Sequence, residues 1–332
     1  MADRVLLAHG SGGKLSHDLV EKIFVATFSN PILNRLDDSA VFELSGHLAF
    51  TTDSYTVSPI FFPGGDIGKL AVCGTVNDLA MTGARPLHLS LSFIIEAGLP
   101  LADLERIVDS VQEAANEAEV KIVTGDTKVV NQGSADKLFI NTAGIGIISD
   151  GVDISGANAQ PGDSIISSGT IGDHGIAILS QREGIEFKVP ITSDCAPLNK
   201  LVADILPTDV HCLRDPTRGG LASTLNELAR QSQVGIRIYE ERLPVNEAVL
   251  AACELLGFDP LHIANEGKLV AIVAAKYTDR ILARMRQNKY GAESAVIGEV
   301  VAEHKGRVVM KTRLGSSRIV DMPVGELLPR IC

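Results

Sequence analysis

The sequence lacks the features that mark several protein classes. Its 332 residues contain no tryptophan, four tyrosines and ten phenylalanines. Lysine and arginine form no cluster and the formal net charge is −11, which argues against the basic surface typical of nucleic-acid binding. No apolar run reaches membrane-spanning length, and the N-terminus lacks the apolar region of a signal peptide. We therefore expect a protein that binds neither nucleic acid nor membrane.

The cysteines are also too few and too scattered for a disulfide framework. They are odd in number, and no CxxC spacing indicates a zinc site. This usage is typical of a reducing compartment, so we expect a cytoplasmic protein. The five are Cys73, Cys195, Cys212, Cys253 and Cys332.

What the sequence does contain favours an α/β (α+β) fold. The apolar content comes from alanine, valine, isoleucine and leucine, and 31 glycines supply tight turns. The length is sufficient for two domains, and residues 150–162, rich in glycine, alanine and aspartate, form the predicted junction. We predict an N-terminal domain at 1–149, a C-terminal α/β domain at 150–311 and a flexible tail at 312–332.

Apolar periodicity predicts the regular elements of both halves. The predicted strands of the first half are 5–7, 41–44, 48–52, 87–95, 121–124 and 138–148, and its helices are 15–24, 66–81 and 101–118. In the second half we predict strands at 164–168, 269–274, 295–301 and 307–311, and helices after residue 173, near 198–205, after 215–220 and at 277–287.

A glycine-rich turn, His9-Gly10-Ser11-Gly12-Gly13-Lys14, lies between the first predicted strand and helix. Backbone N–H groups in such a turn can approach an anion. The spacing fits neither the Walker A nor the GxGxxG pattern. An anion site and an ordinary solvent turn both stay open.

Carboxylates at strand ends and on one helix form the most informative pattern. Magnesium prefers oxygen ligands and uses one or two carboxylates beside substrate phosphates. The alternative is that these residues form turns and caps. For two of them, Asp53 and Asp126, which follow a threonine closely at the end of an apolar strand, we favour a functional role, since open α/β sheets bind ligands there. The five predicted metal ligands are Asp37, Asp38, Asp53, Asp78 and Asp126.

Lys128 and Glu266 are the candidate proton-handling residues. Lys128 follows Asp126 closely enough to share its site, where it is either a phosphate contact or, if desolvated, a base. Glu266, just before a predicted strand, is a second candidate base, although its surroundings also fit an ordinary turn. We interpret His174 as a helix-start residue rather than a metal ligand.

The last residue, Cys332, lies in a segment that fits neither a strand nor a helix. Pro329 prevents a regular element, and the charge of Arg330 is expected to favour the thiolate. From Gly315 onward seventeen residues remain, which span at most roughly 55–60 Å when extended. We therefore expect Cys332 to move between an inward position and an outward one.

Motifs along essentially the whole chain resemble the HypE family of hydrogenase maturation factors. They are His9-Gly-Ser-Gly-Gly13, Asp37-Asp-Ser-Ala40, Thr51-Thr-Asp53, Val76-Asn-Asp-Leu-Ala-Met-Thr-Gly-Ala84, Thr124-Gly-Asp-Thr-Lys-Val-Val130, Asp215-Pro-Thr-Arg-Gly-Gly220, Asn265-Glu-Gly267 and Pro329-Arg-Ile-Cys332. Most are shared with aminoimidazole ribonucleotide synthetase, thiamine-monophosphate kinase and selenophosphate synthetase. The final motif narrows the resemblance to the HypE family.

The resemblance implies two domains of the aminoimidazole ribonucleotide synthetase fold, a homodimer, and ATP held with Mg²⁺ near the dimer interface. It also implies that Cys332 carries the reacting group and that Lys128 and Glu266 handle the protons of the amide. The residues expected to contact the nucleotide are Gly12, Gly13, Lys14, Asn77, Thr124 and Arg218.

The function implied by the resemblance is ATP-dependent dehydration. The carbamoyltransferase HypF places a carbamoyl group on Cys332, which is dehydrated to a thiocyanate, and the cyano group passes to the iron of [NiFe]-hydrogenase on the HypC–HypD scaffold. The alternatives are a small-molecule kinase or synthetase of the same superfamily, and a nucleotide-gated scaffold without catalysis.

Overall fold

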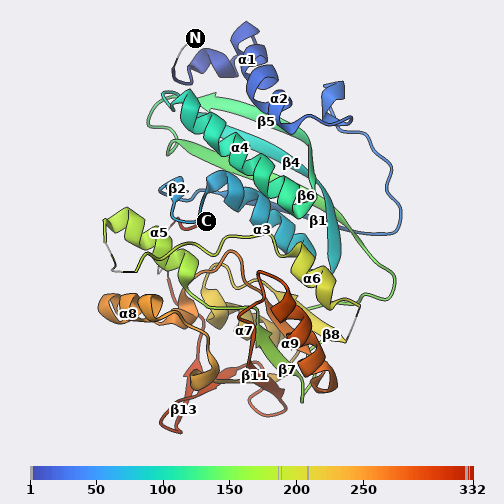
Figure 1. Ribbon diagram of the computed structural model, residues 1–332, viewed down its shortest axis with the longest axis vertical. Coiled ribbons are helices and arrows are strands. Elements are labelled where there is room, and N and C mark those ends of the chain that lie inside the picture. Colours follow the sequence, from blue (N-terminus) through green and yellow to red (C-terminus); the bar gives the residue numbers. More distant parts are fainter. Residues whose placement is uncertain (1–2, 186, 188, 208, 326–327, 329) are drawn as a thin grey trace.

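Two β-sheets, one in each half of the chain, organise the molecule. The computed structural model describes residues 3–185, 187, 189–207, 209–325, 328 and 330–332. Figure 1 shows the first sheet with its helices above the second, and the C-terminus beside α3 between the two halves. The predicted mixed α/β class is confirmed. None of the described helices is long and apolar enough to cross a membrane.

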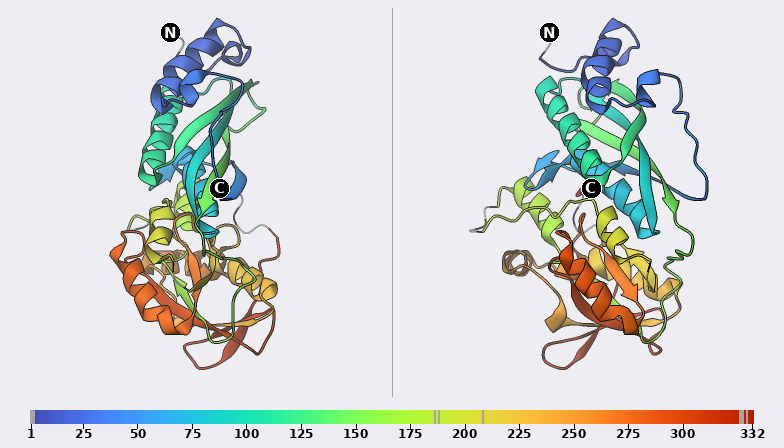
Figure 2. Two further views of the ribbon diagram at one scale, coloured as in Figure 1. Left: turned by 90° about the vertical axis from the view of Figure 1, so that its right-hand side faces the viewer. Right: turned by 45° about the vertical axis from the view of Figure 1, so that its right-hand side comes forward.

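The first sheet has four strands in the order β1-β6-β4-β5. β1 (His47–Tyr55), β6 (Leu138–Ile148) and β4 (Ala84–Glu96) pair antiparallel, and β5 (Lys121–Val130) pairs parallel with β4. Helices α3 (Ile67–Met81) and α4 (Leu101–Ala118) cover one face. Figure 2 shows no described helix on the opposite face, which we call the uncovered face. A short hairpin, β2 (Phe61–Phe62) and β3 (Gly65–Asp66), precedes α3.

The two covering helices form for different reasons. The side chain of Asp66 accepts hydrogen bonds from the backbone N–H groups of Gly68 and Lys69, which caps the N-terminus of α3. α3 is buried almost all round, because it lies between the sheet and the second half of the chain. α4 buries one stripe that includes Leu104, Ile107 and Val111, as its apolar spacing predicts.

The N-terminal segment differs from prediction. Residues 5–7 do not form a strand, since a 3₁₀ turn, η1 (Leu7–Gly10), begins there. The predicted helix at 15–24 is longer, because α1 (Lys14–Leu19), the π-helical η2 (Val20–Val25) and α2 (Ala26–Phe28) follow without a break. Another 3₁₀ turn, η3 (Leu33–Arg35), follows, and the predicted strand at 41–44 is absent from this described part.

The second sheet has seven strands in the order β13-β12-β9-β11-β7-β10-β8. Its strands are β7 (Ser164–Ser167), β8 (Val210–Arg214), β9 (Gly235–Tyr239), β10 (Val270–Val273), β11 (Ala295–Val301), β12 (Val308–Lys311) and β13 (Ser317–Val320). The helices are α5 (Asp173–Glu183), α6 (Asn199–Ile205), α7 (Gly220–Gln231), α8 (Glu247–Leu256) and α9 (Thr278–Gln287), with 3₁₀ turns η4 (Glu240–Arg242), η5 (Pro260–His262) and η6 (Ala275–Tyr277).

The predicted start of a flexible tail at residue 312 is wrong. β13 pairs with β12 from Ser317 to Lys311, and Val320 is buried with its carbonyl accepting a hydrogen bond from Asn226. We therefore reserve the name C-terminal tail for residues 321–332. The predicted boundary at 149/150 is untested and stays a prediction.

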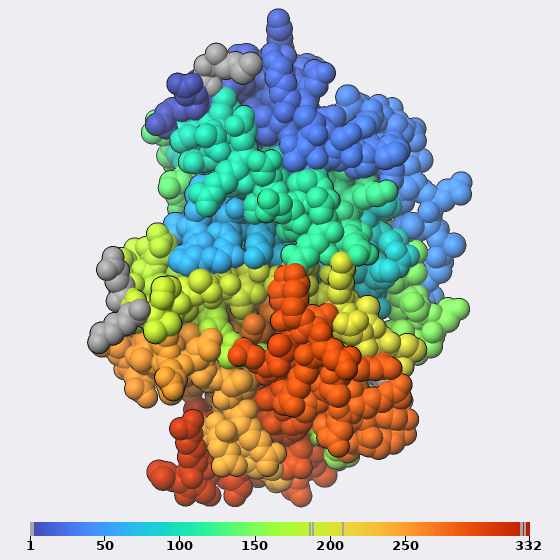
Figure 3. Space-filling view, in the orientation of Figure 1, coloured from blue at the N-terminus to red at the C-terminus, as the bar shows by residue number. Residues whose placement is uncertain are grey.

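The two halves are in direct contact. Figure 3 shows the N-terminal elements (blue to teal) against the later elements (yellow to red) on this face. One apolar core contains Leu70 of α3, Ile176 of α5 and Val249 of α8, together with Leu328 and Ile331 of the tail. The end of the tail is therefore buried between the halves.

Candidate active site

A cavity of about 500 Å³ lies between the N-terminal helical segment and β5. Beside this cavity the N-terminal segment packs closely against β5. A Cβ atom on Gly10 would lie 2.8 Å from the backbone nitrogen of Val129, so the close approach requires glycine. The lining combines an apolar part with carboxylates, a lysine and a glycine turn, a composition that suits a nucleotide. The lining includes Phe24, Phe28, Leu33, Leu36, His9, Gly12, Asp37, Thr124, Asp126 and Lys128.

Asp126 and Lys128 lie together on β5. Lys128 Nζ is 2.7 Å from Asp126 Oδ1 and 2.5 Å from Oδ2. This hydrogen bond lowers the pKa of Asp126 from its usual value. In the sheet, Asp126 is paired with Ser92 of β4, and Lys128 is paired with Ile94. Ser92 and Ile94 alternate with the buried Leu91 and Phe93, so their side chains and those of Asp126 and Lys128 lie on the uncovered face.

The prediction that Asp53 and Asp126 follow the ends of strands is wrong. β1 continues past Asp53 to Tyr55, and β5 continues past Asp126 to Val130. An apolar run indicates only the buried part of a strand, whereas one face of this sheet is uncovered, so polar residues continue both strands. Asp53, Thr142, Leu91 and Gly125 lie in one row across the sheet, which puts Asp53 and Asp126 at opposite edges.

Asp53, Asp78 and Asp215 form a second acidic group, which we call the edge carboxylates. Asp78 Oδ2 accepts a hydrogen bond of 2.9 Å from Thr51, which fixes it beside β1. Burial and the charge of Asp53 raise the pKa of Asp78. Burial and the charge of Asp78 raise the pKa of Asp215 to about 7. These carboxylates therefore repel one another, and a cation placed among them would relieve the repulsion.

The five predicted metal ligands do not form one cluster. Asp37 Oδ2 lies 2.8 Å from Arg35 in an exposed ion pair, and Asp38 is exposed. Asp37 and Asp126 line the nucleotide-sized cavity, whereas Asp53 and Asp78 belong to the edge carboxylates. Within the described ranges, no three histidine, cysteine, aspartate or glutamate side chains are arranged to hold a metal ion by themselves.

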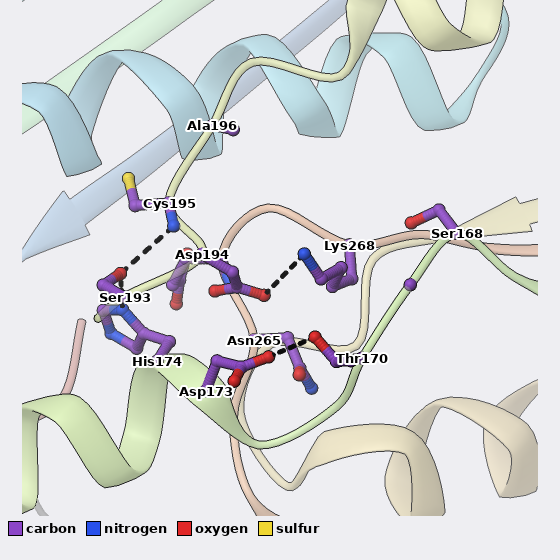
Figure 4. A network of polar contacts seen from close by, with 12 residues as sticks. Ser168, Thr170, Asp173, His174, Ser193, Asp194, Cys195, Ala196, Asn265 and Lys268 are labelled. Atoms are coloured by element: carbon purple, nitrogen blue, oxygen red, sulfur yellow. Dashed lines mark hydrogen bonds and ion pairs between the residues drawn. The ribbon is translucent and has the colours of Figure 1, made fainter. Parts of the chain in front are cut away.

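Glu266 lies deep between the halves, with only 3% of its surface exposed. Its backbone N–H donates to Asp194 Oδ1 at 3.0 Å, and Asp194 faces Lys268 at 3.9 Å (Figure 4). Among the described residues, its Oε1 atom has no hydrogen-bond partner. Burial raises the pKa of Glu266 well above its usual value, and the neighbouring acidic groups raise it further. The carboxylate is therefore desolvated by the fold itself.

Cys332 lies beside Glu266. The backbone oxygen of Cys332 accepts hydrogen bonds from the N–H and the hydroxyl of Thr56, at 3.1 and 3.2 Å. Burial raises the pKa of the Cys332 thiol to about 12, and the Glu266 charge contributes. The expectation that Arg330 favours the thiolate is therefore wrong for this position, because its guanidinium binds the Thr56 carbonyl and Asp136 instead. Pro329 lies outside the described residues.

The predicted nucleotide contacts divide into four groups, of which Asn77 is one. Gly12 and Thr124 line the cavity, whereas Gly13 and Lys14 are exposed at the start of α1. Arg218 lies near Cys332 and Asp78, since its charge opposes the rise in the pKa of both groups.

Asn77 has a structural role in this chain, and its predicted contact with the nucleotide stays a prediction. Its Oδ1 accepts from the N–H of Leu198, and its Nδ2 donates to the carbonyls of Ala196 and Glu266. These bonds use both amide donors and join α3 to the second half of the chain.

Sequence reasoning did not identify Asp215, Asp194 and Thr56, and it gave His174 only its place in the first turn of α5, where it indeed lies. Asp215 belongs to one of the motifs that carry the resemblance, so the motif itself was an available signal. Thr56 and Asp194 carry no sequence signal, because they become important only when the tail and the segment at 191–198 fold against α3.

Known proteins share this architecture. Family models for the AIR synthase related protein match residues 36–148 with its N-terminal domain and residues 160–311 with its C-terminal domain. "Carbamoyl dehydratase HypE" of Rhizobium leguminosarum bv. viciae is 54% identical over 333 residues, which covers 99% of this chain and 95% of the relative.

Solved structures give the same result. "Crystal Structure of Hydrogenase Maturation Protein HypE in complex with ATP" has a TM-score of 0.96 at 52% identity, covering 99% of this chain and 100% of the other. "Crystal structure of HypE-HypF complex" has a TM-score of 0.82 at 53% identity, covering 92% and 99%. The chain therefore belongs to the HypE carbamoyl dehydratases, a family of the AIR synthase related proteins.

Proposed function

We propose that this protein is an ATP-dependent carbamoyl dehydratase that converts an S-carbamoyl group on its own Cys332 into an S-cyano group. The product supplies cyanide ligands for the iron of [NiFe]-hydrogenase. The observation that carries the proposal is the position of Cys332, held by Thr56 beside the buried Glu266. The full-length relatives named carbamoyl dehydratase support the same activity.

ATP binds in the cavity between the N-terminal helical segment and β5. The apolar side chains of that cavity suit an adenine ring, and Gly12, Thr124 and Lys128 suit the polar part of the nucleotide. The solved relative in complex with ATP supports nucleotide binding. Arg218, near Cys332, is positioned to contact the phosphate that is transferred.

The acidic residues fit Mg²⁺. Asp37 and Asp126 lie at the nucleotide cavity, and the edge carboxylates are crowded enough to raise one another's pKa. Magnesium bound with nucleotide uses few carboxylates, so either group supplies enough protein ligands when phosphates are present. Bound Mg²⁺ would neutralise charge on the phosphates.

The reaction removes the elements of one water from the carbamoyl group. The carbamoyl oxygen attacks the γ-phosphorus, the bond from that phosphorus to the bridging oxygen breaks, and ADP leaves while the nitrogen loses one proton. The nitrogen then loses its second proton, the carbon–oxygen bond breaks and phosphate leaves, so that a nitrile remains on sulfur. Glu266, desolvated and without a partner at Oε1, is the proposed acceptor of a nitrogen proton.

The second proton-handling group, Lys128, lies too far away within one chain. Three strand spacings, about 14 Å, separate the β5 edge from the β1 edge, where Thr56 binds Cys332. A lysine side chain does not span this distance. A complete site therefore requires either movement of the tail or a second subunit.

A homodimer completes the site. The uncovered face carries large exposed apolar side chains, including Phe50 (74% exposed), Leu48 (48%) and Ile94 (43%). Such a patch is typical of a subunit interface. A second copy over this face would bury Lys128 and Asp126 and bring the partner subunit's Lys128 toward Cys332 and Glu266.

HypF is the proposed donor of the carbamoyl group, and the HypC–HypD complex is the proposed acceptor of the cyano group. A solved HypE–HypF complex with 53% identity to this chain supports the first partner. For delivery to either partner, the tail must leave the inward position seen here. We expect these transfers to take place in the cytoplasm.

The test is intact-mass spectrometry of the protein incubated with HypF, carbamoyl phosphate and ATP. We expect a mass gain of one carbamoyl group on Cys332 and then the ATP-dependent loss of one water. Carbamoylation without the later loss would contradict dehydratase activity and favour a scaffold. A Cys332→Ala variant that phosphorylates a small substrate normally would favour a kinase.

A further inference from the structure

A buried histidine contacts the tail one residue before Cys332. His174, in the first turn of α5, has no exposed surface, and its Nε2 lies 2.6 Å from the carbonyl oxygen of Ile331. Building on the proposed dehydratase function, we propose that His174 is a positioning residue, which fixes the Ile331 carbonyl and so aligns Cys332 with Glu266 during dehydration.

The hydrogen bonds define one tautomer of His174. The Ile331 carbonyl can only accept, so Nε2 carries a proton and donates it. Nδ1 lies 2.7 Å from Ser193 Oγ, which itself accepts a hydrogen bond of 3.1 Å from the N–H of Cys195. In the neutral ring, with its proton on Nε2, Nδ1 has no proton and accepts the hydrogen bond from the Ser193 hydroxyl. Burial also lowers the pKa of His174, which favours the neutral ring.

The same loop holds both Ser193 and the residue that orients Glu266. Ser193 binds the ring of His174, and the next residue, Asp194, accepts the backbone N–H of Glu266 at 3.0 Å. Figure 4 shows Ser193 and Asp194 side by side, with His174 and Lys268 next to them. A short chain of buried contacts through His174, Ser193 and Asp194 therefore fixes the Ile331 carbonyl relative to Glu266. Such fixed geometry keeps reacting groups aligned.

The arginine contacts of the tail do not give this registration. Arg330 binds the Thr56 carbonyl and Asp136, and Arg182 donates to the Arg330 carbonyl at 2.8 Å, which holds the backbone two residues before the sulfur. These guanidinium groups are only partly buried. His174 is the tail contact that is fully buried and connected to the loop bearing Asp194.

The test compares His174→Leu, which removes the donor, with His174→Gln, which restores an N–H near Nε2. The readouts, measured on the full-length protein, are the alkylation rate of Cys332 by iodoacetamide and the single-turnover dehydration of HypF-carbamoylated protein with ATP. For His174→Leu we expect at least about 10-fold faster alkylation and at least about 10-fold slower dehydration, with carbamoylation by HypF retained. His174→Gln should recover most of both rates.

Ser180→Ala, on the same helix, is the matched control, since its hydroxyl only donates to the Ala177 carbonyl. If His174→Leu does not fold, Ser193→Ala carries the test, because it removes the hydroxyl that donates to Nδ1 and so holds the tautomer, and the same two changes are expected. Wild-type rates in a folded His174→Leu variant would overturn the proposal. If wild-type protein showed tail protection dependent on His174 but no dehydration, the proposed function would fail and the docking contact would stand.

Discussion

Glu266 and Lys128, the two proposed proton-handling residues, lie in opposite environments. Glu266 is 3% exposed and has a raised pKa, whereas Lys128 is exposed and pairs with Asp126 on a surface. Within one chain, Glu266 is enclosed and its backbone N–H is bound by Asp194, whereas Lys128 stays exposed to solvent. This difference is the one expected if, as proposed, a second subunit completes the surroundings of Lys128.

The largest effect is expected from Glu266→Gln, which keeps the shape and removes the base. We expect dehydration on Cys332 to fall by about 10²–10⁴-fold, the usual contribution of a general base, while HypF-dependent carbamoylation continues. Intact-mass spectrometry after single-turnover mixing with ATP measures both. The exposed Glu254→Gln variant, on α8, is the control. A wild-type dehydration rate in the Glu266→Gln variant would show that Glu266 does not act as the base.

Lys128→Ala is expected to lower dehydration by about 10²-fold, and a mixed-subunit experiment tests where this lysine acts. If one site uses Glu266 and the partner subunit's Lys128, dimers that combine a Lys128→Ala chain with a Glu266→Gln chain retain one intact site. A statistical mixture should then recover about a quarter of wild-type activity.

Lys121→Ala, on the same strand, is the control for that experiment. No recovery on mixing, with each variant inactive alone and the mixed dimers verified by native mass spectrometry, would place both residues in one chain. Lys128 would then have to reach Cys332 through movement of the tail.

Phe50→Asp tests the association itself. Placing a charge at the centre of the exposed apolar patch should weaken the dimer by at least about 10-fold, since a buried unpaired charge is costly at an interface. Sedimentation over a concentration series measures this. Leu255→Asp is the matched control, because Leu255 is 73% exposed on α8 in the other half. Equal dissociation of both variants, or of neither, would contradict an interface on the uncovered face.

The smallest expected effect is on stability, through Asp215. Its pKa in the folded chain is about 7, above the value of 3.8 for an exposed aspartate, so the folded state favours the neutral acid. Stability from this group is complete below about pH 4 and is lost as the pH rises toward and past 7.

Asp215→Asn should therefore be more stable than wild type at pH 8, by about 2 kcal/mol, and nearly equal at pH 4. Thermal melts without nucleotide or Mg²⁺ across this range measure the difference. The exposed Asp109→Asn variant is the control. If the difference in stability between the two proteins did not change with pH, burial and the neighbouring carboxylates would not raise the pKa of Asp215 in the folded chain.

The sequence was sufficient for the elements whose burial repeats regularly. α4 was predicted to the residue, because its apolar stripe and polar face alternate with helical spacing. β13 was mistaken for flexible chain, because a short edge strand with exposed side chains gives no such pattern. β8, β9 and α8 were also not predicted.

The site was harder to predict than the fold. The motifs identified Glu266 and Asp78, but the sequence did not show that Asp53 and Asp126 lie at opposite edges of one sheet, since strand order depends on long-range pairing. Asn77 lies in a motif, but the sequence did not show that both of its amide donors join the two halves of the chain.

The pairing of β13 with β12 also limits how far Cys332 can move, and this limit affects the kinetics of the proposed dehydration. With Val320 buried, only twelve residues follow it, a reach of at most roughly 40 Å. A short tether of this kind holds its end at an effective concentration of about a millimolar relative to the nucleotide site. If the proposed dimer forms, dehydration is then first-order in the carbamoylated dimer, so its rate does not change on dilution as long as the dimer persists, and free thiols must exceed that effective concentration to compete.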